Sequence, residues 1–281
     1  MLAKAVENGA EKTAKNGDGS IRVLLIGDVV GKSGCRALFS LASSLKKEYQ
    51  ADLLIANGEN ALEGSGLSPE LVADFFKAGV DLITSGNHIW RHPAIFDLLD
   101  KEPRLLRPEN YPRGVPGKGS ARLNFKDCQL LVINLEGQLN NHSRLRCPFL
   151  TAKEILQKAN PRPKIVIIDF HAEYPAEKEA LAWFLDGEVS LLYGTHTHVP
   201  TADERILPNG TAYITDIGMT GPEESVIGMS VQVALKRALT QLPLKLEVED
   251  KPAVLMGLVI EFDSHSGKAL SLKRIKKQAD F

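Results

Sequence analysis

The sequence has little of what marks a secreted or membrane-bound protein. Its three cysteines, Cys35, Cys128 and Cys147, are odd in number and far apart, which predicts free thiols rather than a disulfide framework. No apolar run approaches the roughly 18 residues that a membrane span requires. Residues 1–20 also lack the apolar region of a signal peptide. We therefore expect a cytoplasmic protein with no membrane partner.

An excess of charge of one sign is missing too. Lysine and arginine number 34 against 35 aspartate and glutamate residues, so the net charge is −1. Composition therefore does not indicate a nucleic-acid partner, although local cations could still bind a small nucleotide. A chain of 281 residues with 43% hydrophobic and 25% charged residues suits one large α/β domain or two small ones.

Residues 1–20 show no apolar periodicity and end in Asn-Gly-Asp-Gly-Ser, which predicts a flexible N-terminal tail, with a short helix as the alternative. Beyond them, short apolar and β-branched runs alternate with helical patterns, which predicts an α/β protein with room for a second sheet packed on the first. The expected strands cover 22–27, 52–57, 80–86, 129–137, 164–171, 189–196, 211–218 and 253–262, and the expected helices 35–50, 68–79, 92–102 and 176–187.

Local signals support some of these boundaries and leave two segments open. Ser68 as N-cap and Pro69 at the first helical position predict the start of the second helix. Residues 107–125 and 138–149 are poor in periodicity. Long loops inside a compact domain are often functional, and variable surface loops are the alternative.

The segment from Gly27 to Ser33 is close to a phosphate-binding loop. That motif needs four residues between its first glycine and the Gly-Lys-Ser/Thr. Here only three residues separate Gly27 from Gly31, so too few backbone N–H groups are available to surround a phosphate. The sequence therefore does not favour a nucleotide triphosphatase, and Asp28 becomes the residue of interest.

Polar side chains follow five of the expected strands. They are Asp28, then Glu59 and Asn60, then Asn87 and His88, then His171, and finally His196 and His198. Because the carboxyl ends of strands in open α/β sheets gather at one edge, we expect these side chains to converge.

Such a cluster would be unfavourable without a cation. Clustered carboxylates repel one another and buried imidazoles lose hydration, unless a metal ion offsets both effects. Nitrogen and oxygen ligands without sulfur suit manganese, iron or zinc better than calcium or magnesium. The sequence therefore predicts a transition-metal site at the strand ends.

The motifs around these residues resemble the signature of the calcineurin-like metallophosphoesterase superfamily. The segments IGDVVG, NGENA, TSGNHIW, DFHAE and GTHTHVPTADERILPNGTAYITDIGMTGP are similar to its YmdB-type branch, whose members are bacterial phosphodiesterases acting on cyclic nucleotides. The resemblance spans residues 21–275. It implies a single domain over that range, an α/β/β/α two-sheet sandwich and assembly into homo-oligomers.

The resemblance also implies a role for each motif residue. One metal ion would be held by Asp28, Glu59, Asn60 and His198, and a second by Glu59, Asn87, His171 and His196, with Glu59 bridging. His88 would be the proton donor. Iron is the metal expected first and manganese next.

Two positions depart from the wider superfamily. Val30 stands where the first motif usually has a histidine, and Glu59 replaces the usual bridging aspartate. The YmdB-type branch shares both changes. A site with one imidazole fewer favours iron or manganese over zinc.

The resemblance therefore implies a dimetal phosphodiesterase that hydrolyses cyclic nucleotides, the 2′,3′- form, the 3′,5′- form or both. A water bridging two metals roughly 3.5–4 Å apart would attack the phosphate, and His88 would protonate the leaving oxygen. Two alternatives remain open. One is a phosphomonoesterase or protein phosphatase on the same scaffold, and the other is a metal-binding regulatory protein that acts through a partner or RNA.

The remaining candidates are expected outside the site. His92 is expected to be structural, and His142 and His265 to be solvated. Arg144 and Arg146 could neutralise a substrate phosphate, but solvation at the surface is the simpler expectation. Glu136 ends a strand without a motif around it and is left out of the site.

Overall fold

The protein is described by a computed structural model covering residues 19–125, 128–139 and 144–279. The predicted tail, residues 1–20, therefore lies outside the described residues except at its last two positions. Within the described ranges, no helix is both long enough and apolar enough to cross a membrane.

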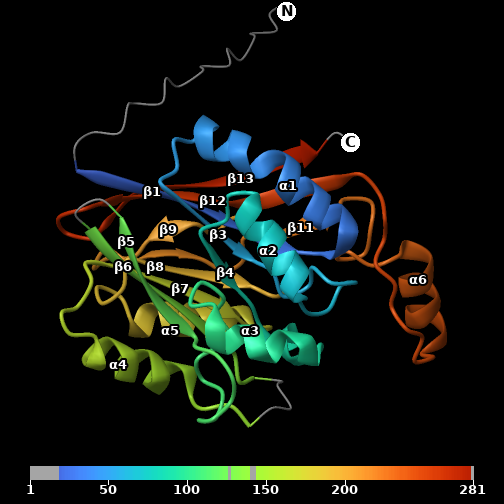
Figure 1. Cartoon of the computed structure of the whole chain (residues 1–281), viewed down its shortest axis with the longest axis horizontal. Coiled ribbons are helices and arrows are strands. Elements are labelled where there is room, and N and C mark those ends of the chain that lie inside the picture. Colours follow the sequence, from blue (N-terminus) through green and yellow to red (C-terminus); the bar gives the residue numbers. More distant parts are fainter. Residues whose placement is uncertain (1–18, 126–127, 140–143, 280–281) are drawn as a thin grey trace, which may run out of the picture.

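Two sheets form the centre of the molecule (Figure 1). The first has the order β2 (Asp28–Val29), β11 (Met219–Pro222), β12 (Ala253–Asp263), β1 (Ser20–Ile26), β3 (Leu53–Asn57) and β4 (Leu82–Thr84), and β13 (Ala269–Ala279) pairs with β12. The second has the order β5 (Ser120–Phe125), β6 (Cys128–Glu136), β7 (Ile165–His171), β8 (Leu191–Thr195), β10 (Ala212–Ile214) and β9 (Arg205–Ile206).

Helices cover the outer face of each sheet (Figure 1). The first sheet is covered by α1 (Gly31–Glu48), α2 (Pro69–Lys77), the short helices η1 (Asn87–Trp90) and η2 (Pro93–Ile95), and α3 (Phe96–Lys101). The second is covered by α4 (Pro148–Lys158) and α5 (Pro175–Phe184). As predicted, the amide of Leu71 donates to Ser68 Oγ at 3.3 Å, which caps α2.

Alternation along the strands explains the layers. In β1, Val23 and Leu25 face the second sheet, whereas Leu24 and Ile26 face the helices. A strand with apolar side chains on both faces must be buried on both, and two sheets sandwiched between helices satisfy that requirement. The predicted α/β/β/α sandwich is therefore confirmed. The limits of the single domain, 21–275, stay a prediction.

Three parts of the strand prediction differ from the structure. The expected strand 211–218 is shorter in the structure: β10 ends at Ile214 in the second sheet, the chain turns at Gly218 with φ +83°, and β11 follows in the first sheet. The aperiodic segment 107–125 contains β5. β13 was not predicted because its sequence, ALSLKRIKKQA, places basic residues on an exposed face and buries only Ala269, Ile275 and Ala279.

One segment projects from the sandwich. We call residues 223–252, which include α6 (Val231–Thr240), the arm (Figure 1). None of the residues of α6 is buried. The arm returns to the body at Val248, whose side chain lies over Gly31. A Cβ on Gly31 would come 2.5 Å from Val248 Cγ1, and its φ of +61° also favours glycine.

Candidate metal centre

The predicted site residues lie where parallel strands end. β1, β3 and β4 are parallel neighbours in the first sheet, and β7 and β8 are parallel neighbours in the second. Their carboxyl ends carry Asp28, then Glu59 and Asn60, then Asn87 and His88, then His171, and finally His196 and His198. The site is thus formed where the edges of the two sheets meet.

The centre of the cluster is formed by Glu59, His171 and His196. Glu59 Oε1 lies 2.9 Å from His171 Nε2, which lies 3.0 Å from His196 Nδ1. One ligand atom from each of the three residues falls within 4.8 Å of the others, a grouping that could hold a metal ion. Glu59 and His171 are buried, with side-chain exposures of 0% and 1%.

Asp28 completes the centre with an oxygen that has no partner. Its Oδ2 accepts from the backbone amide of His196 at 3.1 Å. Its Oδ1 is buried and finds no hydrogen-bond partner among the described residues; the nearest ring nitrogen, His171 Nδ1, is 3.8 Å away. An unsatisfied buried carboxylate oxygen beside three ligand-type groups is the arrangement that a cation would stabilise. The residues therefore fit a metal ion.

Asn60 joins His88 to His198. Its Oδ1 lies 2.6 Å from His88 Nδ1, and its Nδ2 lies 3.1 Å from His198 Nε2 and 3.2 Å from Glu59 Oε1. The amide oxygen is therefore turned toward His88. The ligand role expected for Asn60 stays a prediction.

His88 and Asn87 begin η1, where both are half-buried. The amide of His88 donates to Glu59 Oε2 at 3.2 Å, which ties η1 to the centre. The side chain of Asn87 makes no hydrogen bond to another described residue. Gly86 precedes them because no larger residue would fit: a Cβ there would come 2.3 Å from Glu59 Oε2 and 2.2 Å from His171 Cδ2.

The charges in the cluster are coupled. Burial by itself would raise the pKa of Glu59, but the neighbouring histidines, first His171 and then His88 and His196, together outweigh burial and lower it. Burial would lower the pKa of His171, whereas the Glu59 carboxylate raises it to about 9. Burial and the charge of His171 lower the pKa of His196 to about 3, and burial raises that of Asp28 to about 6.

Sequence reasoning missed a second group of buried polar residues behind the cluster. Asp169 is fully buried and accepts hydrogen bonds from Thr195 Oγ1 at 2.7 Å and from Thr84 Oγ1 at 2.5 Å. Thr195 Oγ1 also lies 2.9 Å from His171 Nδ1. An aspartate within the apolar strand 164–171, two residues before a histidine, was the available signal.

A buried ion pair supports the turn that carries His196 and His198. Lys178 Nζ donates to Asp216 Oδ2 at 2.9 Å and to the carbonyl of Thr195 at 2.8 Å. The same Asp216 oxygen accepts from Thr197 Oγ1 at 2.8 Å. The turn needs this support because His196 and His198 have φ of +95° and +65°, values that disfavour any residue with a side chain. Nothing in the helical pattern around Lys178 predicts this role.

The other candidates lie outside the cluster. His92 Nε2 bonds the carbonyl of Ser65 at 2.8 Å, and His265 is exposed. Arg146 pairs with Glu154. Glu136 is buried at the end of β6, beside His171 in register. His142 lies outside the described residues.

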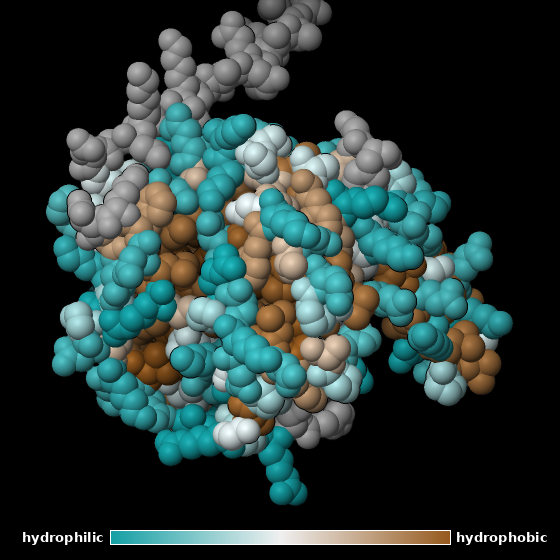
Figure 2. All heavy atoms as spheres, in the orientation of Figure 1, coloured by the Kyte–Doolittle hydropathy of each residue, from teal (hydrophilic) through white to brown (hydrophobic). Residues whose placement is uncertain are grey.

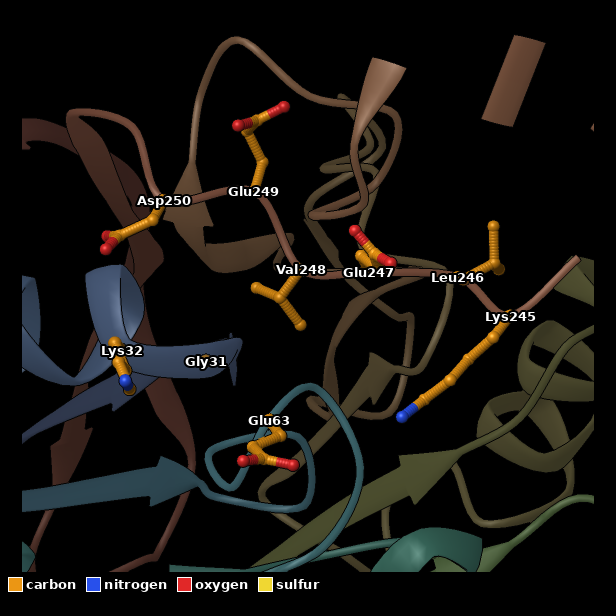
Figure 3. Close-up of a pocket in the computed structure, with 9 residues that line it drawn as sticks. All are labelled: Gly31, Lys32, Glu63, Lys245, Leu246, Glu247, Val248, Glu249 and Asp250. Atoms are coloured by element: carbon orange, nitrogen blue, oxygen red, sulfur yellow. The ribbon is translucent and has the colours of Figure 1, made fainter. Parts of the chain in front are cut away.

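A pocket of about 300 Å³ lies beside the cluster, between the body and the arm (Figure 3). Lys245 and Val248 reach toward it from the arm, and Glu63 lies on the facing loop after β3. The pocket adjoins the site through Gly31, whose amide donates to the carbonyl of Asn60 at 2.9 Å. Lys32 belongs to residues 27–33, a segment one residue too short for a phosphate-binding loop, and is exposed at the edge of the pocket.

Comparison with known proteins identifies the family. The sequence profile described as YmdB-like protein matches residues 24–275. The chain belongs to the YmdB-like family. It is 45% identical to the 2′,3′-cyclic-nucleotide 2′-phosphodiesterase of Bacillus subtilis strain 168, over 91% of this chain and 96% of that protein.

Solved structures agree with this assignment. A crystal structure of a novel phosphatase of Mycoplasma pneumoniae, 36% identical, superposes with a TM-score of 0.88 over 92% of this chain and 94% of that one. A putative 5′-nucleotidase of Staphylococcus aureus shares the fold, with a TM-score of 0.62 and 15% identity over 93% of this chain and 55% of that one. The YmdB-type resemblance is confirmed, as is the prediction that this YmdB-like protein is an enzyme of the phosphoric ester hydrolase class.

Proposed function

We propose that this YmdB-like protein is a dimetal phosphodiesterase that opens the phosphate ring of cyclic nucleotides. The observation that carries the proposal is the convergence of Glu59, His171 and His196 beside the unpartnered Oδ1 of Asp28. The name of the Bacillus subtilis relative, at 45% identity, supports a 2′,3′-cyclic nucleotide as the substrate.

The proposed ligands are the seven residues predicted from the sequence. They are Asp28, Glu59, Asn60, Asn87, His171, His196 and His198. When bound, two such ions polarise phosphoryl oxygens and lower the pKa of water. Imidazole and carboxylate ligands without sulfur suit iron first and manganese next.

We assign His88 the protonation of the leaving oxygen. Its Nδ1 is engaged by Asn60 Oδ1 at 2.6 Å, which leaves Nε2 free of any partner among the described residues. Its side chain is 25% exposed, so Nε2 can reach a bound substrate. The hydrogen bond from its backbone amide to Glu59 Oε2 fixes the distance of His88 from the centre. Proton transfer by a positioned histidine accelerates a reaction by on the order of 10²–10⁴-fold.

Hydrolysis of 2′,3′-cyclic AMP tests the proposal. Protein loaded with iron or manganese should open the ring rapidly and release little phosphate from the product monoester. Release of phosphate from the monoester at a similar rate would instead favour the phosphatase alternative. Absence of turnover from protein that holds its metals would favour the regulatory one.

We also propose that the arm is covered by a second copy of the chain in a homo-oligomer. Its exposed apolar residues include Leu235, Leu239 and Leu242, which are 55%, 83% and 51% exposed. Brown side chains gather on this projection in Figure 2. Large exposed apolar patches generally mark interaction surfaces.

We also propose a cytoplasmic location for the protein. The free state of the described cysteines supports it.

A further inference from the structure

His196 is the member of the central group that lies nearest to solvent. Its side chain is 28% exposed, whereas those of Glu59 and His171 are buried. Its two ring nitrogens face opposite environments. Nδ1 lies 3.0 Å from His171 Nε2, inside the cluster, and Nε2 lies 3.0 Å from Oε2 of Glu173, outside it.

The chemistry of these two neighbours determines where the imidazole proton resides. A neutral imidazole has one N–H donor and one lone pair, and an ionised carboxylate can only accept. Next to Glu173, Nε2 must therefore carry the hydrogen. The lone pair is then on Nδ1, which is the nitrogen turned toward Glu59 and His171.

The other two histidines of the proposed centre follow the same pattern. Thr195 Oγ1 donates to Asp169, so it accepts from Nδ1 of His171 and leaves Nε2 for the cluster. The carbonyl of Ile227 accepts from Nδ1 of His198 at 2.8 Å and again leaves Nε2 inward. Each ring is thus oriented by an acceptor outside the cluster, as is typical of metal-binding histidines.

The outer acceptor of His196 is held less firmly by the fold than those of His171 and His198. The acceptor of His171 is a buried hydroxyl, and that of His198 is a backbone carbonyl, but Glu173 is a flexible side chain that is 55% exposed. The neighbouring turn also holds His196 at φ +95°. We propose that Glu173 is a positioning residue that keeps the hydrogen of His196 on Nε2 and its Nδ1 directed into the cluster.

Glu173→Ala tests this inference in the full chain. Its side chain is largely exposed, so its removal should leave folding intact. The matched control is Glu179→Ala, because Glu179 is 49% exposed and its ion pair with Arg205 lies outside the cluster. Glu173→Gln keeps an oxygen that can accept the hydrogen bond and should restore part of the effect.

Two measurements give the outcome. In metal-stripped protein, ¹⁵N NMR of the histidine rings should show His196 with hydrogen on Nε2 in the wild type and in Glu179→Ala, and a mixture of tautomers in Glu173→Ala. The affinity for Mn²⁺, measured by competition with a chelator, should fall by about 10–100-fold in Glu173→Ala only. An unchanged tautomer, or an affinity within about twofold of the wild type, would overturn the role of Glu173.

The inference rests on the proposed function only for its metal. The tautomer measurement needs neither metal nor substrate, so it can support Glu173 even if the wild type turns out not to bind Mn²⁺. Conversely, suppose that the wild type binds Mn²⁺ and opens 2′,3′-cyclic AMP while the Glu173→Ala variant is unaffected. That result would refute the positioning role of Glu173 and keep the proposed function.

Discussion

The centre and the arm differ in which kind of side chain they bury and which they expose. In the centre, polar and charged side chains such as Asp28, Glu59 and His171 are buried at the meeting point of two sheets. In the arm, apolar side chains such as Leu235 and Leu239 are exposed to solvent on a helix that buries none of its residues. In the part of the chain that the structure describes, a hydrogen bond from His198 Nδ1 to the carbonyl of Ile227 joins the two regions.

The contrast shows what each region needs from outside the chain. Buried carboxylates and imidazoles are costly unless a charge of opposite sign accompanies them, so the centre requires a cation. Exposed leucines on a projecting helix would be stabilised by a surface that covers them, which is why we propose a second copy of the chain as the partner of the arm. Changes in the centre should therefore affect metal and turnover, and changes in the arm should affect assembly.

The largest effect is expected from His171→Ala in the centre. The variant removes the ring that touches Glu59 and His196. Affinity for Mn²⁺ should therefore fall by more than the ~10–100-fold typical of losing a residue that only orients a ligand, and turnover should fall with it. His265→Ala, at an exposed site, is the control. Full metal occupancy in His171→Ala would show that this ring is not a ligand.

His88→Ala should separate chemistry from metal binding. Turnover of 2′,3′-cyclic AMP should drop by about 10²–10⁴-fold because the proton donor is lost. Metal content should remain within about twofold of the wild type, since the central group of Glu59, His171 and His196 is intact. Loss of metal along with turnover would make His88 a ligand and refute its role as donor.

Charges placed on the arm should affect assembly without affecting the centre. Leu235→Glu combined with Leu239→Glu should shift the protein toward the monomer in analytical ultracentrifugation, because both side chains are exposed and available to a second copy. Leu270→Glu, at a 54% exposed position on β13, should leave the mass unchanged. Equal masses for wild type and double variant would contradict the proposed homo-oligomer contact.

The smallest effect concerns the reactivity of Cys35, which is buried in α1. Burial raises the pKa of Cys35 to about 12, so almost no thiolate is present at pH 8. Iodoacetamide should therefore modify the half-buried Cys147 well before Cys35 in the native protein. Mass spectrometry with Cys147→Ser as the control would follow the order. Rapid labelling of Cys35 would show that the body opens.

The sequence predicts the centre better than its surroundings. Apolar strands that end in Asp28, Glu59 or His171 are local signals, and the rule that parallel strands end at one edge brings them together. Lys178 and Asp216 carry no such signal, because their pairing depends on how α5 packs beside the turn that follows β10. The contact between Glu173 and His196 likewise cannot be predicted from the sequence, because it depends on where the ring of His196 lies in the structure.

The arm was not foreseen because its helix has no buried stripe against the rest of the chain. Residues 231–240 form α6 although none of them is buried, so periodicity gave no reason to place them on the body. β13 escaped prediction for a related reason, since it is rich in exposed basic residues and buries only three of its side chains. Both cases show that a pattern predicts an element best when that element faces the core.

The most direct test of the account is the number of metal ions bound per chain. Protein reconstituted with manganese or iron, freed of excess metal and analysed by inductively coupled plasma mass spectrometry should hold two ions. Asp28→Ala should hold fewer, because it removes the buried oxygen that has no partner within the described chain. A wild type that retains no metal under these conditions would contradict the central claim that the buried cluster is a metal centre.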